Sequence, residues 1–178
     1  MTVADISAQL AQLPRDKQVY LLRALPLHLA DAGQQTRLRQ LLTNYPFLTA
    51  KLNALGYQSL VGDYTYALAG NRPTTAGAAD QQTGLAAIQG ALQLTAHILM
   101  RDPHQLPGQL YARLMRLAAP DAQALLGQIR TAPVYPWLRL LTPSLQSAGG
   151  MLVRTFRSND NAMADVRVTP DGRWIVAA

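Results

Sequence analysis

The sequence predicts a mainly α-helical fold, a helical-hairpin array in two halves followed by a short C-terminal β segment. Apolar residues recur three and four positions apart through most of the first 146 residues, which is the spacing of one helix face. Glycine and proline divide this pattern into short runs, so we expect short helices stacked as antiparallel neighbours. From Gly149 the apolar residues alternate instead, as they do in β-strands. With 49% hydrophobic and 15% charged residues, the 178-residue chain can bury a core.

The first half, residues 1–70, is expected to contain four helices. The opening helix, residues 17–32, has an apolar stripe and is closed by Gly33. Pro26 lies inside it and predicts a bend within one element rather than a break into two. The next helices are expected to be separated by short connections, with Gly56 ending the third. Their ranges are residues 36–45, 46–56 and 57–70.

Residues 71–80 collect Pro, Thr, Gly and Asn and are expected to form an exposed linker to the second half, residues 81–146. Residues 85–102 then carry a long apolar stripe and predict the longest helix of the chain. Asp102, which a proline follows, is placed as the N-cap of the next helix. Pro120 is expected to open another helix.

The last part of the second half is proline-rich and predicts only a short helix, over residues 137–141. Residues 147–178 form the β segment, in which residues 152–156 and 166–168 alternate between apolar and polar. A TPDG turn leads from there into a strand in RWIVAA. A strand pair of this size is marginal in water, so this segment needs a sheet partner outside these 178 residues.

The composition excludes several kinds of site. There are no cysteines, which removes disulfides, thiolate metal sites and cysteine nucleophiles. All ten acidic residues are aspartates, so zincin helices, glutamate pairs and calcium loops closed by Glu cannot occur in this sequence. The N-terminus lacks a leader pattern and no uncharged apolar run is long enough for a bilayer, so a cytoplasmic location is expected.

The net charge of +6 raises the question of a nucleic-acid partner, because a basic face binds phosphates. The arginines are spread singly or in pairs, without a basic run. Scattered arginines more often cover helix surfaces with their apolar stems. We therefore expect a protein partner, with nucleic acid disfavoured and no membrane partner.

The chemistry-bearing residues do not form a catalytic pattern. His97 and His104 lie seven residues apart across a proline, so they do not have the paired spacing of a helical metal site. His28 is expected to pack at a helix–helix contact. A triad of Ser59, His97 and Asp63 can be written down, but no strained nucleophile turn supports it. We expect no enzyme activity, no metal and no cofactor.

Two stretches of the chain resemble parts of bacterial signalling NTPases of the NB-ARC and NACHT type. The first, residues 20–64, reads YLLRALPLHLADAG…LRQLLTNYPFLTAKLNALGYQSLVGDY and is similar to the helical arm related to that of the apoptotic protease-activating factor. The second, residues 101–178, reads RDPHQLPGQLYARL…PWLRLLTPSLQSAGGMLVRTF…VTPDGRWIVAA and resembles the lead into a WD-repeat propeller. This second likeness implies that the β segment is an incomplete propeller blade. Ser158 and Asn159 stand where such a blade has a Gly-His pair, and the GxxxxGK[ST] nucleotide loop is absent from the sequence.

By this resemblance, the chain is a non-catalytic helical linker or scaffold between a nucleotide-binding switch and a WD-repeat sensor propeller, and it acts through protein–protein contacts. The alternative is a free-standing helical-repeat adaptor that binds a peptide or partner helix in a groove. A linker should expose apolar surface at the ends of the chain, whereas an adaptor should expose it on a concave face.

Three residues are the candidate partner contacts. Asp63 and Tyr64 lie in a GDY sequence of the fourth expected helix, and the plain alternative for them is a capping aspartate and a half-buried tyrosine. Trp137 is flanked by prolines and is either an exposed interface anchor or a cover for the join between the helices and the propeller.

Overall fold

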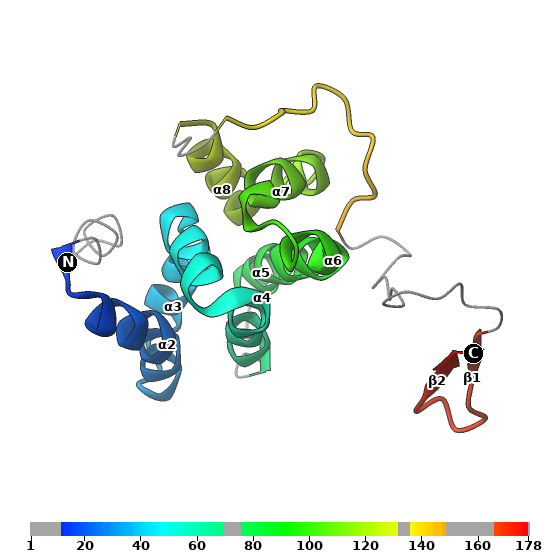
Figure 1. Cartoon of the computed structure of the whole chain (residues 1–178), viewed down its shortest axis with the longest axis horizontal. Helices are drawn as coiled ribbons and strands as arrows, with labels where there is room; N and C mark the ends of the chain where they lie inside the picture. The colour runs from blue at the N-terminus through cyan, green and yellow to red at the C-terminus, as the bar shows by residue number, and fades with distance from the viewer. Residues whose placement is uncertain (1–11, 70–75, 132–135, 149–165, 178) are drawn as a thin grey trace.

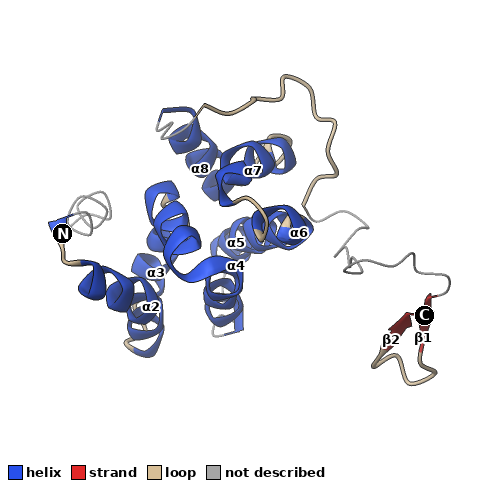
Figure 2. Ribbon diagram, in the orientation of Figure 1, coloured by secondary structure: helices blue, strands red, loops and turns tan. Residues whose placement is uncertain are grey.

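The computed structural model describes residues 12–69, 76–131, 136–148 and 166–177. These residues form a mainly helical molecule with a short antiparallel two-stranded sheet at the C-terminal end, which confirms the predicted fold class (Figure 1). The helices gather into one body, and the two strands lie apart from it (Figure 2). The elements are α2 (Arg15–Asp31), α3 (Gln35–Leu42), α4 (Tyr45–Ala69), α5 (Ala76–Leu94), α6 (Ala96–Leu99), the 3-10 helix η1 (Pro103–Gln105), α7 (Leu106–Leu114), α8 (Pro120–Thr131), β1 (Val166–Val168) and β2 (Ile175–Ala177).

Helix α2 is a single element that continues through Pro26, and Gly33 closes it as predicted. Gly33 adopts a left-handed conformation (φ 66°), and its N–H donates to the carbonyl of Ala30 at 3.0 Å. The N–H of Gln34 donates to the carbonyl of Leu29 at 2.9 Å. This pair of bonds is a Schellman motif, which satisfies the last carbonyls of the helix.

The third and fourth predicted helices meet end to end in α4. Their boundary was predicted at Gly56, and the backbone leaves the helical region there (φ 79°, ψ 175°). Only glycine adopts such a positive φ without strain, so Gly56 permits an abrupt change of direction. Helix α4 therefore consists of two segments, residues 45–55 and 57–69, that join without a loop.

Helix α5 differs from prediction at both ends. The linker expected over residues 71–80 is helical from Ala76, since five of the nine residues from 76 to 84 are alanine or glutamine, helix formers that outweigh the two glycines. The helix expected to run to residue 102 ends at Leu94 instead. The hydroxyl of the buried Thr95 donates to the carbonyls of Ala91 and Leu92, both at 2.9 Å, and such bonds compete with the helical backbone ladder.

The next corner follows the sequence closely. Asp102 has an extended backbone, and its Oδ1 accepts a hydrogen bond from the N–H of His104 at 3.0 Å, which confirms it as an N-cap. The capped turn is a 3-10 helix that leads into α7. Helix α8 begins at Pro120 as predicted. The short helix predicted over residues 137–141 is wrong, because these residues are not helical.

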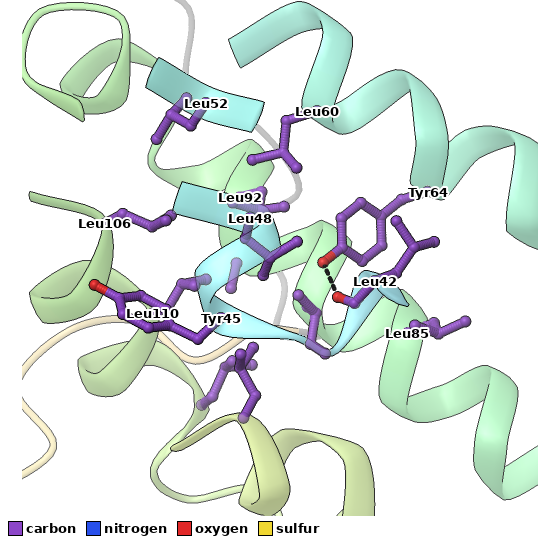
Figure 3. Close-up of a cluster of buried hydrophobic side chains, with 14 of the residues drawn as sticks. Leu42, Tyr45, Leu48, Leu52, Leu60, Tyr64, Leu85, Leu92, Leu106 and Leu110 are labelled. Atoms are coloured by element: carbon purple, nitrogen blue, oxygen red, sulfur yellow. Dashed lines mark hydrogen bonds between the residues drawn. The ribbon is translucent and has the colours of Figure 1, made fainter. Parts of the chain in front are cut away.

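Buried side chains from α2 to α8 belong to one hydrophobic cluster. Leu48, Leu60 and Leu92 have no exposed surface and come from both predicted halves of the array. Figure 3 shows how these side chains converge between the segments of α4 and the neighbouring helices. The division of the chain at residues 70, 80 and 146 remains a prediction.

The strands β1 and β2 confirm two of the predicted strands. They pair in antiparallel register, with Arg167 opposite Val176. The connecting turn uses Gly172 in a left-handed conformation (φ 69°), and its N–H donates to the carbonyl of Thr169 at 2.8 Å. The strand predicted over residues 152–156 lies outside the described residues.

Candidate interaction surface

Asp63 is an interior residue of α4, where it forms an ion pair with Lys51. The two residues lie on opposite sides of the Gly56 kink, so the pair ties the two segments of α4 together. The plain alternative for Asp63, a capping aspartate, is therefore wrong, because Asp63 lies inside α4. Burial raises the pKa of Asp63 to about 6, and the nearby ammonium group opposes this shift. Burial also lowers the pKa of Lys51, which the carboxylate of Asp63 opposes.

Tyr64 is fully buried rather than half-buried. Its hydroxyl donates a hydrogen bond to the carbonyl of Leu42 at 2.6 Å, and this bond fastens α4 to the end of α3 (Figure 3). Burial raises the pKa of Tyr64 well above its ordinary value, so the hydroxyl remains a donor. The prediction that Asp63 and Tyr64 contact a partner remains a prediction, and within this chain both side chains are engaged in internal contacts.

Polar contacts that the sequence did not indicate join α8 to the first half of the chain. The guanidinium of Arg39 on α3 binds both carboxylate oxygens of Asp121, at 2.8 and 2.7 Å. Gln128 accepts a hydrogen bond from the N–H of Tyr45 at 2.9 Å and donates to the carbonyl of Thr43 at 3.0 Å. The two parallel hydrogen bonds between Arg39 and Asp121 fix the orientation of the two side chains as well as their distance. Together with the bonds of Gln128, they hold α8 in place against the α3–α4 connection.

Gly84 allows α5 to pack closely against α8 at Asp121. A Cβ atom placed on Gly84 would lie 2.8 Å from Oδ2 and 2.9 Å from Cβ of Asp121. Real side chains do not approach so closely, so only glycine allows α5 and α8 to come together at this point. The sequence gave no signal for this contact, because Gly84 directly precedes the helix expected over residues 85–102.

Trp137 packs on α7 through a short stack of side chains. Its ring lies 5.5 Å from the ring of Tyr111, with an interplanar angle of 54°. The guanidinium of Arg130 lies 5.4 Å from the centre of the Tyr111 ring and also donates to its hydroxyl at 3.1 Å. Tilted aromatic pairs and cation–π contacts are attractive. Trp137 is thus partly buried and held in a defined orientation.

The strap, residues 136–148, passes over α7 after α8 without regular secondary structure (Figure 1). The guanidinium of Arg113 on α7 donates to the carbonyl of Gln146 at 3.0 Å, and the N–H of Ala148 donates back to the carbonyl of Arg113 at 3.4 Å. Leu138 and Leu141 of the strap are 93% and 79% exposed. Pro136 and Pro143 flank the helix predicted over residues 137–141, and the bonds with Arg113 hold the strap in an irregular path instead.

A groove with a volume of about 730 Å³ lies between the strap and the η1–α7 corner. Its apolar wall comes from the strap and its polar wall comes from η1 and α7. The lining residues are Asp102, His104, Gln105, Gly108, Gln109, Pro136, Trp137, Leu138, Leu140, Ser144 and Leu145. Trp137 is the candidate partner contact from the sequence that lies in this groove, and the sequence did not indicate the groove itself.

The other candidate groups are the histidines and the residues of the triad that can be written from the sequence. Within the described residues, no three His, Cys, Asp or Glu side chains lie together as a metal site requires. His28 is exposed, so the prediction that it packs at a helix–helix contact is wrong. Asp63, which could be written into a triad with Ser59 and His97, forms an ion pair with Lys51. None of the described helices combines the length and apolar character that a membrane crossing requires.

A family model for the APAF-1 helical domain matches residues 6–106, which is more than half of the chain. The matched range includes all of α2 to η1 and the first residue of α7, and the strap and the strands lie beyond it. No curated protein and no solved structure matches the chain.

Proposed function

Because this chain belongs to the APAF-1 helical domain family, we propose that it is a non-catalytic helical linker between a nucleotide-binding switch and a WD-repeat sensor propeller. In this role the chain transmits movement through protein–protein contacts. The nucleotide-binding part is of the NB-ARC or NACHT type, as the sequence resemblance implies. Whichever chain carries it, the nucleotide chemistry takes place outside these 178 residues.

The observation that supports this role is the continuity of the interior. One buried cluster includes side chains from α2 at one end to α8 at the other. The ion pair between Arg39 and Asp121 and the two hydrogen bonds of Gln128 add directional ties between helices far apart in sequence. A close-packed interior transmits displacement because it has low compressibility. A stiff body is what a linker between two moving parts requires.

The C-terminal hairpin supports the second part of the proposal. Trp174, Ile175 and Val176 are 69%, 58% and 57% exposed, so both faces of β2 offer apolar surface. An isolated two-stranded hairpin is marginal in water and gains stability when further strands cover it. We assign residues 147–178 to a partial propeller blade, after a helical half at residues 81–146, a linker at 71–80 and a first half at 1–70. The remaining blades belong to the same or a partner chain.

Trp137 is the partner contact that this proposal favours. Its ring is oriented by Tyr111, and Leu138 beside it is almost completely exposed. Aromatic anchors that are held in place before binding dominate many protein interfaces. Asp63 and Tyr64 would contact a partner only if α4 rearranged, since both are buried in this chain.

The test is to read the open reading frame on both sides of the segment that encodes this chain. The expected result is a nucleotide-binding core with a GxxxxGK[ST] loop upstream and further strand-rich repeats downstream. Stop codons with unrelated sequence on both sides would contradict the linker role. That outcome would favour the free-standing adaptor, for which the groove beside Trp137 would be the binding site.

A further inference from the structure

The strap is attached to the helical body at two places, and the first attachment is an apolar one at Trp137. The ring of Trp137 lies 5.5 Å from the ring of Tyr111 and packs against the hydrophobic cluster of the body. A Cβ placed on Gly108 would lie 3.6 Å from the carbonyl oxygen of Leu138, so the strap passes close to α7 here. Apolar burial is the main favourable term in such packing. We call this contact the Trp137 attachment.

The second attachment lies at the other end of the strap and depends on hydrogen bonds. The guanidinium of Arg113 donates to the carbonyl of Gln146 at 3.0 Å, and the N–H of Ala148 donates to the carbonyl of Arg113 at 3.4 Å. The second distance is longer than a usual N–H···O bond. Ala148 is buried, but its side chain is a single methyl group. We call this contact the Arg113 attachment.

The cost of burying Arg113 weakens the second attachment. Arg113 is 8% exposed, and within the described part of the chain its charge has no acidic partner. Its buried Nε has no acceptor among the described residues either. A buried charge or donor that lacks a partner carries a desolvation cost. When the strap lifts at Gln146, water can reach the guanidinium, and this hydration offsets the lost hydrogen bond.

The stretch between the two attachments adds little to either of them. Leu138 and Leu141 are 93% and 79% exposed. The strap has no regular secondary structure, so no ladder of backbone hydrogen bonds forces its two ends to move together. The two attachments can therefore open independently, and the Arg113 attachment is the weaker one.

The groove between the strap and the η1–α7 corner depends on the Arg113 attachment. Its lining on the strap side includes Ser144 and Leu145, which directly precede Gln146. The opposite wall comes from η1 and α7. Release of Gln146 would carry these two residues away from that wall, while Trp137 stayed in place. The groove is therefore present when the Arg113 attachment is closed and lost when it opens.

We propose that the strap is a releasable clasp, which opens at the Arg113 attachment while the Trp137 attachment remains closed, and which removes the groove when it opens. Ala148, at the end that opens, is followed by residues 149–165, which lead to β1 of the hairpin. In the proposed function the hairpin belongs to the sensor propeller. The inference rests on that function and specifies how the sensor side acts on the site beside Trp137.

The experiment measures distances between two spin labels on the full chain by pulsed electron paramagnetic resonance. The sequence has no cysteine, so labels attach only to cysteines that are introduced. One label is placed on α8 by Ala124→Cys, and the other is placed on the strap by Arg139→Cys or by Gln146→Cys. All three positions are exposed. The pair at 124 and 139 reports on the Trp137 attachment, and the pair at 124 and 146 reports on the Arg113 attachment.

The main variant is Arg113→Met, which removes the guanidinium and keeps an apolar side chain. Because a hydrogen bond from a charged group is lost, the ratio of long to short distances between residues 124 and 146 should rise roughly tenfold. The distances between residues 124 and 139 should stay unchanged. Arg116→Met is the matched control, since Arg116 is exposed just beyond α7. It should leave both distance distributions like those of the parent chain.

Two outcomes in Arg113→Met would overturn the inference. A change in both distances would show that the strap leaves as one unit, and a change in neither would show that Arg113 does not hold it. Should Arg113→Met fail to fold by circular dichroism, Ala148→Gln gives the same discrimination, because it places a larger polar side chain at the buried end of the strap. A negative result would leave the linker role intact, since the flanking reading frame tests that role separately.

Discussion

The helical body and the C-terminal hairpin both have regular hydrogen-bonded secondary structure, yet among the described residues only the body has an interior. Leu41, Leu48 and Leu92 of the body have no exposed surface, whereas Val168 and Ile175 of the hairpin are 62% and 58% exposed. Hydrogen bonds replace bonds to water and contribute little net stability, while apolar burial is the main favourable term in folding. The comparison teaches that regular secondary structure alone does not make a region stable. The body has a buried core that can stabilise it, whereas we expect the hairpin to depend on another surface.

The largest difference should appear when one charged side chain is replaced in each region. Lys51→Met would leave Asp63 in the interior without its cation, and the expected loss is about 3–5 kcal/mol of unfolding free energy at pH 8. In the hairpin, Asp171 accepts from Thr169 and from the N–H of Arg173 but is fully exposed. Asp171→Asn should leave the urea midpoint unchanged. Urea unfolding followed by circular dichroism measures both variants.

The control for this prediction is the double variant Lys51→Met/Asp63→Leu. Replacing a whole buried ion pair by apolar residues is often neutral or stabilising, so the double variant should recover the loss. A double variant as unstable as Lys51→Met alone would show that packing rather than charge governs this position.

Removal of apolar contacts should separate the two regions next. Leu48→Ala deletes a fully buried side chain in the first segment of α4, and the expected loss is about 2–5 kcal/mol. Val176→Ala changes a residue that is 57% exposed, and the expected change is within about 0.5 kcal/mol. Both changes in unfolding free energy are obtained from the shift of the urea midpoint, with the dependence of the free energy on urea concentration unchanged. Similar losses for the two variants would break the comparison, because the hairpin would then have a packed face in solution.

A smaller effect is expected from pH, and only the body should show it. The pKa of Asp63 is raised to about 6 from an ordinary 3.8. The folded state therefore holds this proton more tightly than the unfolded state, and stability falls as pH rises from 3.8 to about 6. Relative to the Lys51→Met/Asp63→Leu variant, the chain should lose on the order of 2–3 kcal/mol across this window and change little from there to pH 7. Parallel curves of unfolding free energy against pH for the two proteins would contradict a raised pKa for Asp63.

The features that could be predicted from sequence are local ones. Gly33 and Gly56 mark positions of positive φ, Asp102 caps its own turn, and Pro120 begins a helix. Each of these depends on the residue's own backbone preference or on a bond to a neighbour within a few positions. The β period after Gly149 likewise predicted β1 and β2 correctly.

The failures occur where a local preference met a tertiary constraint. Thr95 is a weak helix former, but the apolar residues around it predicted that the helix continues. In the structure its hydroxyl is buried and bonds to the backbone, and α5 ends there. Residues 137–141 have apolar side chains that suit a helix, yet contacts with α7 hold the strap in an irregular path. His28 looked like a packing residue and is exposed, because apolar spacing does not say which neighbour will cover a face.

The sequence by itself determined the mainly helical class, the caps and turns, and the change to β structure near the C-terminus, because these follow from interactions over a few residues. Only the tertiary structure decided which charges meet. Arg39 and Asp121 are 82 positions apart, and the groove joins the strap to η1 and α7. No sequence period encodes such contacts. They depend on how whole helices pack.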